Sequence, residues 1–163
     1  MIILEGPDGH GKSTLAEKLQ QEFDASIWTS GSPPKDTADI VMRAKAVESY
    51  AASGERLIID RCPAISELVY GNVVRGDVQL PHAWRYIFKL VNYEVIFIYC
   101  KTTDPIHSPK MGENPKHLAK INFHEEAIIK AYDDIFSDIL CLEYDWRTNN
   151  IEDLFAWVHN QWR

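Results

Sequence analysis

Eight consecutive residues near the start of the chain restrict its fold more than any other feature of the sequence. They read Gly6-Pro7-Asp8-Gly9-His10-Gly11-Lys12-Ser13 and fit the pattern G-x-x-x-x-G-K-[ST]. The apolar run Met1–Glu5 precedes them, and Lys12–Phe23 follows with its apolar residues on one helical face. Glycines let backbone N–H groups turn inward around an anion, and the positive end of the helix points at the same place. The sequence therefore predicts a buried strand, an anion-binding loop and a helix, in this order.

The motif indicates a nucleotide as the anion. Lys12 supplies a point charge for the β- and γ-phosphates, and the hydroxyl of Ser13 is placed to ligate Mg²⁺. No Asn-Lys-x-Asp segment, which would indicate guanine binding in a GTPase switch, occurs in the chain. We therefore expect ATP with Mg²⁺; His10 either touches a phosphate when charged or fills a partly exposed position. The expected ATP-binding residues of this segment are Gly6, Asp8, Gly9, His10, Gly11, Lys12, Ser13 and Thr14.

The remaining elements alternate along the chain. Apolar runs predict strands over Met1–Glu5, Ala25–Thr29, Leu57–Asp60, Val95–Cys100 and Ile139–Tyr144. Helical spacing predicts helices over Lys12–Phe23, Asp36–Ala52, Pro63–Val74, Pro81–Asn92, His117–Phe136 and Ile151–Trp162. This order predicts an α/β P-loop NTPase fold, a five-stranded parallel sheet with helices on both faces, as one domain over residues 1–163.

Composition excludes several classes of protein. The net charge of −7 is spread evenly over the chain, so no basic surface for long nucleic acid is expected. The longest apolar run, Val95–Cys100, is far shorter than the roughly 20 residues that cross a bilayer, and no secretory signal is visible. The three cysteines are widely spaced, which favours a reducing cytoplasm over a disulfide framework. Small-molecule nucleotides are the expected partners, with no membrane involved.

A second polar motif, Asp60-Arg61, ends the predicted strand Leu57–Asp60. A carboxylate at the carboxyl end of a parallel strand beside a phosphate loop is placed to handle Mg²⁺ and its waters. An arginine next to it can hold a second phosphate with its forked guanidinium. A surface ion pair is the alternative interpretation of this dipeptide. The expected metal-binding residues are Ser13 and Asp60.

Together, these motifs resemble those of a known family. The run Gly6–Thr14 followed by Asp60-Arg61 is similar to the thymidylate kinase group of nucleoside monophosphate kinases, especially its compact bacteriophage members. Ser66 and Tyr70 keep the family's four-residue spacing, with one extra residue between Arg61 and the serine. The resemblance implies transfer of the γ-phosphoryl group of ATP to a deoxynucleoside monophosphate in the cytoplasm (the host's, if phage-encoded), with thymidylate as the leading acceptor. It also implies a homodimer formed through helices; the alternative is that the apolar helix faces all belong to the core.

The resemblance implies roles by position. Asp8 would lie near the sugar 3′-hydroxyl and the metal, and Arg61 would hold the acceptor phosphate. Tyr70 would pack on the acceptor sugar where a 2′-hydroxyl would clash; ordinary packing on a helix face is the alternative. The implied acceptor-binding residues are Asp8, Lys35, Arg43, Asp60, Arg61, Ser66, Glu67 and Tyr70.

Two positions depart from the family pattern. Glu67 follows the serine, where the family often has an asparagine or a small residue that contacts the acceptor base. An ionised carboxylate accepts hydrogen bonds and donates none, so the acceptor base differs from thymine or is contacted through N3–H or water; a solvent-facing Glu67 is the alternative. The family's Arg-Glu-Pro segment is replaced by Ser30–Lys35, and Lys35 or Arg43 is expected to replace its acceptor-phosphate arginine.

The polar segment Lys101–Lys120 contains several lysines and prolines, which predicts a short basic lid over the transferring phosphate. Some family members place an arginine where this chain has Gly9, so Lys110 and Lys116 are expected to supply the charge; a solvated loop is the alternative. Arg147 follows the last strand and is expected to stack on the donor adenine. The predicted catalytic residues are Lys12, Asp8, Arg61, Lys110 and Lys116.

Three other functions stay open at this point. A deoxynucleoside kinase would need a carboxylate base on the 5′-hydroxyl, for which Asp8 or Glu5 is available. A polynucleotide 5′-kinase is less favoured because no basic surface is expected. A nucleotide-binding regulatory module would keep the phosphate loop but show no turnover that depends on an acceptor.

Overall fold

The computed structural model describes residues 1–31, 33–103, 105 and 115–162. The strands are β1 Ile2–Glu5, β2 Ser26–Thr29, β3 Leu57–Asp60, β4 Ile96–Cys100 and β5 Leu142–Tyr144. The helices are α1 Lys12–Phe23, α2 Thr37–Ser53, α3 Pro63–Ser66, the π-helix η1 Glu67–Arg75, α4 Ala83–Asn92, α5 Pro115–Phe123, α6 Glu125–Phe136 and α7 Ile151–Gln161. Within these ranges, none of the helices combines the length and apolar character that a membrane span requires.

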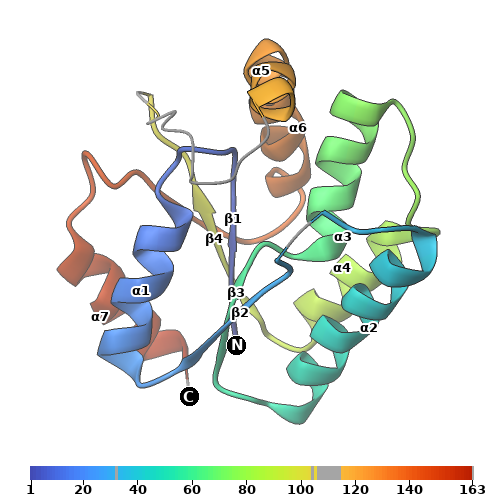
Figure 1. The fold of residues 1–163 in the computed structure, drawn as a ribbon. Helices are drawn as coiled ribbons and strands as arrows, with labels where there is room; N and C mark the ends of the chain where they lie inside the picture. Colours follow the sequence, from blue (N-terminus) through green and yellow to red (C-terminus); the bar gives the residue numbers. More distant parts are fainter. Residues whose placement is uncertain (32, 104, 106–114, 163) are drawn as a thin grey trace.

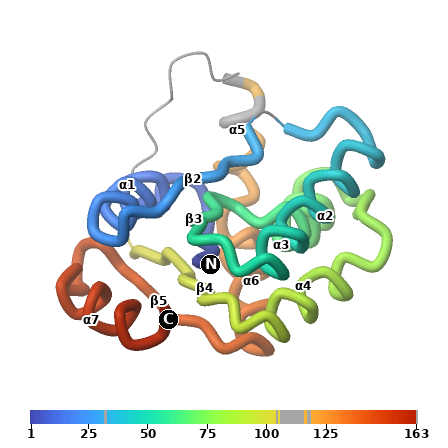
Figure 2. The backbone as a smooth tube through the Cα atoms, turned by 90° about the horizontal axis from the view of Figure 1, so that it is seen from below, coloured from blue at the N-terminus to red at the C-terminus, as the bar shows by residue number. Residues whose placement is uncertain are grey.

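The strands form one parallel sheet in the order β2-β3-β1-β4-β5. Figure 1 shows α1 and α7 on one face of the sheet and α2, α3, α4 and α6 on the other. Each face has its own buried apolar cluster, which joins the sheet to the helices that cover it. The same two helical layers flank the strands when the molecule is seen from below (Figure 2). The predicted five-stranded parallel α/β fold is therefore confirmed.

The side chains of β1 alternate between the two clusters, which decides where its last residue points. Ile2 and Leu4 belong to the cluster under α1 and α7, whereas Ile3 belongs to the cluster on the opposite face. Glu5 lies two residues beyond Ile3 and therefore points to the same face. Its register partner on β4 is Tyr99, which lies in the cluster of Ile3. An acidic side chain is thus directed into an apolar face of the sheet.

Helix α2 shows how local sequence signals set the ends of an element. The Asp36 carboxylate accepts a hydrogen bond from the backbone N–H of Asp39 at 2.9 Å, which caps the start of the helix. Gly54 ends the same helix in a left-handed conformation, with φ at 71°. The helix therefore runs Thr37–Ser53, one residue displaced from the prediction at each end.

The prediction of one regular helix over Pro63–Val74 is wrong, because most of this segment has the hydrogen-bond pattern of a π-helix. Only Pro63–Ser66 is α-helical, and Glu67–Arg75 forms the wider π-helix, which ends at Gly76. The side chain of Arg75 donates to the carboxylate of Glu67 across the length of this element. Because a π turn differs from an α turn by one residue in its hydrogen bonds, apolar spacing alone does not reveal it.

The long helix predicted over His117–Phe136 is also wrong, because the structure has two helices there. The chain leaves helical geometry at His124, and α6 begins at the next residue. Glu125 and Glu126 form the first turn of α6, where acidic side chains favour the positive end of the helix dipole. This acidic pair is the local sequence signal for the start of a second helix, which the spacing of apolar residues does not reveal.

Other boundaries differ from the prediction by one to three residues, and β1, β2 and β4 each begin one residue later than predicted. Helix α4 begins at Ala83 instead of Pro81 because His82 adopts a left-handed conformation with φ at 56°. Strand β5 begins at Leu142 instead of Ile139, and the intervening Leu140 is largely exposed. Helix α7 ends at Gln161, one residue before the predicted end.

Candidate active site

Two glycines of the phosphate loop lie where a side chain would collide with a neighbouring segment. Gly6 has φ at 140°, and a Cβ atom there would lie 2.1 Å from the carbonyl oxygen of Cys100 at the end of β4. Gly11 precedes α1 in a left-handed conformation, and a Cβ atom there would lie 2.9 Å from the ring of Trp146. The loop is therefore packed between the end of β4 and the segment after β5, and both positions require glycine.

Lys12 begins α1 and is almost completely buried beneath this loop, with 6% of its surface exposed. Its Nζ donates to the carbonyl oxygen of Pro7 at 2.5 Å, so the ammonium group points back into the loop. Burial, helped by the positive charge of Arg61, lowers the pKa of Lys12 to about 8. A phosphate in the loop would favour the charged form, so this lysine is prepared for an anionic ligand.

Ser13 and Asp60 meet from different elements, one at the start of α1 and the other at the end of β3. The Ser13 hydroxyl donates to the Asp60 carboxylate at 3.0 Å. Because Asp60 lies two residues after Ile58, it points to the face of the sheet that α1 covers. A hydroxyl and a carboxylate are hard oxygen ligands, and Mg²⁺ usually takes one or two of these together with phosphate oxygens and waters. The predicted metal-binding pair is therefore brought together, and its chemistry fits Mg²⁺.

Arg61 is the centre of a polar cluster at the carboxyl end of the sheet. It adopts a left-handed conformation with φ at 76°, and its backbone N–H donates to the carbonyl of Leu4. Its guanidinium donates to Asp8 at 2.5 Å, to the hydroxyl of Tyr70 at 3.1 Å and to the hydroxyl of Tyr132 at 3.3 Å. The guanidinium also lies 5.2 Å from the centre of the Tyr70 ring, over its face. The predicted residues Asp8, Arg61 and Tyr70 are thus in direct contact.

The charges of this cluster favour an ionised Asp8. Burial opposes ionisation of Asp8, but the positive charges of Arg61 and Lys12, together with hydrogen bonds from Tyr70 and Arg61, lower its pKa. Asp8 stays partly open to solvent, with 37% of its side chain exposed. Burial raises the pKa of Tyr70 to about 12, so its hydroxyl keeps its proton and donates to Asp8 at 3.1 Å.

Glu5 also belongs to this cluster, although the sequence motifs gave it no firm role. It is completely buried, and burial raises its pKa to about 7. One carboxylate oxygen accepts from the backbone N–H of Cys62 at 2.5 Å, and the other accepts from the hydroxyl of Tyr132 at 3.0 Å. The sequence signal is an acidic residue that ends an apolar run directly before the glycine loop. Tyr132 has no comparable signal, because its helical spacing resembles that of a core aromatic.

His10 does not occupy the partly exposed position that was one of its two expected placements. Only 1% of its surface is exposed, and its Nδ1 accepts a hydrogen bond from the backbone N–H of Thr102 at 3.0 Å. Thr102 is itself buried and follows β4 by two residues. His10 therefore joins the phosphate loop to the first residues of the predicted lid. A contact of His10 with phosphate stays a prediction.

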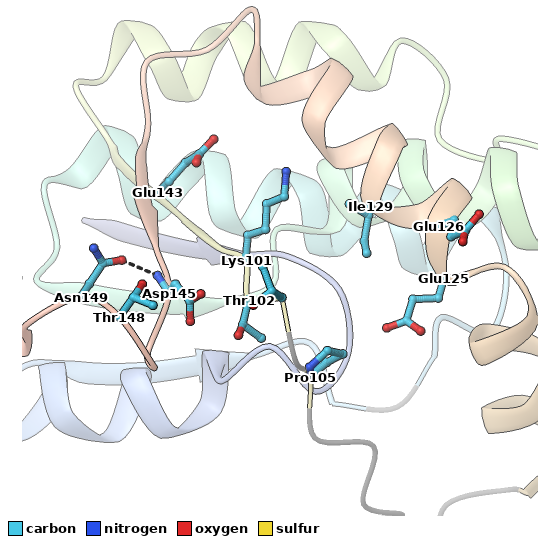
Figure 3. A pocket seen from close by; sticks show the side chains of 11 residues that line it. Lys101, Thr102, Pro105, Glu125, Glu126, Ile129, Glu143, Asp145, Thr148 and Asn149 are labelled. Carbon is cyan, nitrogen blue, oxygen red and sulfur yellow. Dashed lines mark hydrogen bonds between the residues drawn. The ribbon is translucent and has the colours of Figure 1, made fainter.

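Arg147 lies beside Trp146 in the segment after β5, and its stacking on the donor adenine stays a prediction. Its guanidinium carbon is 4.6 Å from the centre of the Trp146 ring, and that ring contacts Gly11. A cavity of about 800 Å³ adjoins this turn, between the end of β4, the start of α6 and the segment after β5 (Figure 3). The hydrogen bond from the backbone N–H of Asp145 to the Asn149 side chain, at 2.6 Å, holds the turn that forms one wall.

Two of the residues predicted to bind the acceptor, Glu67 and Ser66, differ in their hydrogen bonds. Glu67 is 4% exposed, so its solvent-facing alternative is wrong; it accepts from Arg75 and from the backbone N–H of Gln79. A contact between Glu67 and an acceptor base stays a prediction. The Oγ atom of Ser66 is buried and has no hydrogen-bond partner among the residues that the structure describes.

The two predicted replacements for the missing arginine lie just before α2 and in its second turn. Arg43 makes a forked contact with the Asp39 carboxylate, at 2.8 and 2.9 Å, and also donates to the carbonyl of Ser30. The backbone N–H of Lys35 donates to the same carboxylate at 3.0 Å, while the residue as a whole is exposed. Arg43 thus fastens the loop after β2 to α2, and its contact with an acceptor phosphate stays a prediction, as does that of Lys35.

The structure describes only one of the two predicted lid lysines. Lys110 lies outside the described residues. Lys116 lies in the first turn of α5 and is exposed. Their role over a transferring phosphate therefore stays a prediction.

Comparison with solved structures supports this architecture. The YorR protein of Bacillus subtilis, in complex with phosphorylated GDP, matches at a TM-score of 0.67 and 20% identity over 98% of this chain and 93% of its own. A deoxyadenosine kinase from M. mycoides, with dCMP and a flexible dCDP bound, matches at 0.54 and 16% over 98% and 96%. A gluconokinase from Sinorhizobium meliloti 1021 matches at 0.56 and 14% over 99% and 90%.

The chain has a P-loop NTPase fold. At these identities the similarity establishes the fold alone. The sequence by itself matches no family model and no curated protein. The nature of the substrate must therefore be argued from the residues at the carboxyl end of the sheet.

Proposed function

We propose that this chain is a Mg²⁺-dependent kinase that transfers the γ-phosphoryl group of ATP to a deoxynucleoside monophosphate, with thymidylate as the leading acceptor. The observation that carries the proposal is the placement of Asp60 and Arg61. Asp60 contacts Ser13 at the phosphate loop, while the next residue turns away to meet Asp8 and Tyr70. Two adjacent residues thus connect a donor site to a second site for an anion, as transfer between two nucleotides requires.

The donor side consists of the glycine loop, Lys12, Ser13 and Asp60. The loop and Lys12 would bind the β- and γ-phosphates of ATP. Ser13 and Asp60 would hold Mg²⁺, which supplies positive charge to the transferring group when it is bound. We place the donor base beside the turn after β5, where Trp146 and Arg147 stack next to Gly11.

The acceptor side consists of Arg61, Asp8 and Tyr70. Arg61 holds five N–H donors in a fixed fork, which suits a phosphate better than a single ammonium charge does. Tyr70 lies against this guanidinium, so a sugar whose phosphate contacts Arg61 would meet the tyrosine ring. In the resemblance to thymidylate kinases this contact favours deoxyribose over ribose. The nucleotide-bound states of two structural neighbours, with phosphorylated GDP and with dCMP, are compatible with such an acceptor.

A deoxynucleoside kinase is the second candidate, because one neighbour is a deoxyadenosine kinase. That reaction requires a carboxylate base on the sugar 5′-hydroxyl. Glu5 has the raised pKa that suits a base, but it is completely buried and both of its oxygens accept hydrogen bonds within the protein. Asp8 is accessible, but its pKa is lowered, which weakens it as a base. These observations favour a monophosphate acceptor, whose phosphate needs no such base.

The experiment is a coupled assay of ADP release with ATP and Mg²⁺, run over dTMP, dCMP, dGMP, dAMP and the four deoxynucleosides. We expect turnover to depend on a monophosphate and to be fastest with dTMP. The Glu67→Gln variant should then show whether this residue shapes the preference among bases. Faster turnover with a nucleoside would favour the second candidate. ADP release that no acceptor accelerates would favour a nucleotide-binding regulatory module and contradict the proposal.

We also propose that the chain works in the cytoplasm. The three cysteines are free, which is compatible with the reducing cytoplasm expected for nucleotide metabolism.

The proposal includes a homodimer formed through helices. Helix α4 exposes Phe88 and Val91, and α2 exposes Met42, so apolar surface is available for such a dimer. Sedimentation analysis of the purified chain tests the dimer; a monomer at micromolar concentration would contradict it.

A further inference from the structure

We propose that Tyr132 is a positioning residue that keeps Arg61 directed toward the acceptor phosphate by separating it from the buried carboxylate of Glu5. The inference rests on the proposed function, because it assigns Arg61 to the acceptor phosphate. Tyr132 is fully buried on α6, on the face of the sheet opposite to α1. Its role follows from the partners of its hydroxyl group.

The Tyr132 hydroxyl makes two hydrogen bonds, one with a carboxylate and one with a guanidinium group. It donates to a carboxylate oxygen of Glu5 at 3.0 Å and accepts from the Arg61 guanidinium at 3.3 Å. A phenol has one donor and can accept as well, so this arrangement uses both capacities. The hydroxyl thus lies between an anion and a cation that would otherwise attract each other directly.

This attraction is strong because Glu5 is removed from water. Apart from burial, the positive charge of Arg61 is the largest influence on the ionisation of Glu5. A direct pair between them would draw the guanidinium inward, away from Asp8 and Tyr70. With the hydroxyl in place, Arg61 instead keeps its contacts to Asp8 and Tyr70, on the side where Asp8 is open to solvent.

Packing holds the Tyr132 ring firmly enough to keep its hydroxyl in this position. The ring stacks on Tyr99, with centroids 5.9 Å apart, and lies 6.4 Å from the ring of Phe136. It also meets the edge of the Tyr70 ring, with centroids 6.4 Å apart. Helix α6 follows the predicted lid in the chain, so the residue that orients Arg61 belongs to an element outside both motifs found in the sequence.

The neighbouring Tyr99 offers a matched control. It is equally buried and stacks on the same ring, but its hydroxyl donates to Asp133 at 2.8 Å and not to the cluster around Arg61. Tyr99→Phe and Tyr132→Phe therefore remove the same atom from adjacent positions in one aromatic stack. A loss of function confined to Tyr132→Phe is not explained by a general weakening of the core.

The test compares Tyr132→Phe, Tyr99→Phe, Glu5→Gln and the double variant Glu5→Gln/Tyr132→Phe at pH 7.5. Calorimetry measures the affinities for dTMP, the other three deoxynucleoside monophosphates and ATP, and the coupled assay measures turnover. Tyr132→Phe should weaken monophosphate binding about tenfold, with no change in ATP affinity, whereas Tyr99→Phe should bind like the wild type. In the double variant the attraction to Glu5 is gone, so affinity should return to within about threefold of the wild type.

The outcomes separate this inference from the proposed function. Equal monophosphate affinities in Tyr132→Phe and Tyr99→Phe, or an equal loss of ATP affinity, would overturn the role of Tyr132. Failure of the double variant to recover would overturn the part played by Glu5. A wild-type protein that binds monophosphates without turnover would contradict the kinase activity only, since the affinities still report on Arg61. A wild type that binds no monophosphate would overturn both. Thermal melts verify that all four variants fold.

Discussion

The guanidinium of Arg61 lies 2.5 Å from the carboxylate of Asp8, and this contact joins the end of β3 to the phosphate loop. The two residues are distant in the sequence and belong to different motifs. Because Asp8 stays ionised and partly exposed, it holds the guanidinium at the open end of the sheet. An incoming phosphate would then meet a positive group whose direction is already fixed, which lowers the entropic cost of binding.

The forked geometry of Arg61 yields the first prediction. Arg61→Lys keeps the charge but cannot contact Asp8, Tyr70 and Tyr132 together. We expect the KM for the monophosphate to rise about tenfold, while the KM for ATP changes little. Steady-state kinetics with each substrate varied in turn measures both constants. Arg85→Lys, on the exposed side of α4, is the control. An equal rise in the KM for ATP would show that Arg61 does not act specifically on the acceptor.

The buried ammonium of Lys12 yields the second. Lys12→Ala removes the positive charge that points into the phosphate loop, so kcat should fall about 10²- to 10³-fold. Lys18→Ala changes an exposed residue of the same helix and should leave kcat unaltered. The coupled assay compares the two variants. Retention of more than half of the wild-type rate in Lys12→Ala would remove this lysine from the catalytic residues.

The close approach of Gly6 to β4 yields the third. Gly6→Ala would place a Cβ atom 2.1 Å from a backbone oxygen, so the free energy of unfolding should fall by more than about 3 kcal/mol. Gly54→Ala is the matched control, because Gly54 also has positive φ but has open space around it. Its cost should be about 1 kcal/mol, from backbone conformation alone. Urea unfolding measures both; similar losses would show that the loop moves away from β4 at little cost.

The raised pKa of Glu5 yields the fourth. Its value is 4.5 in the unfolded chain and about 7 in the folded protein. Glu5 therefore contributes stability that is fully present below about pH 4.5 and is lost as the pH rises through 7, when a buried group must ionise. Glu5→Gln is neutral throughout, so its free energy of unfolding relative to the wild type should increase over this range by at most about 1.4 kcal/mol per pH unit.

Chemical unfolding of the wild type and Glu5→Gln at pH 5, 6, 7 and 8 tests this dependence. The histidines are common to both proteins, so the difference between the two curves isolates Glu5. Asp8 has the opposite sign, because its lowered pKa contributes stability that is lost only as the pH falls further into the acid range. A difference that stays constant from pH 5 to 8 would show that Glu5 is ionised throughout.

The ion pair at the ends of the π-helix yields the fifth. Arg75→Ala leaves the buried Glu67 carboxylate without its charged partner, so the free energy of unfolding should fall by about 1–3 kcal/mol. Lys130→Ala breaks an exposed pair with Asp134 and should cost no more than about 0.5 kcal/mol. Thermal melts compare the two variants. Equal costs would mean that the π-helix does not depend on this pair.

The sequence allowed the sheet, the glycine loop and the neighbourhood of Ser13 and Asp60 to be predicted, because each depends on local pattern. Strand Leu57–Asp60 and helix Lys12–Phe23 coincide with the observed elements for this reason. The π-helix and the break at His124 were missed, since both alter hydrogen bonding without altering apolar spacing. The role of Tyr132 was missed because it depends on a contact across the core that no local pattern reports.

The alternation of side chains along β1 has a consequence for how this chain can change during evolution. Asp60 and Glu5 serve opposite faces of the sheet, and β1 keeps them in register through the pairing of Leu4 with Asp60. Loss or gain of one residue within β1 would turn the Glu5 side chain to the face that α1 covers, and would shift the phosphate loop relative to β3 and β4. During evolution β1 can therefore tolerate substitutions, but no single-residue insertion or deletion.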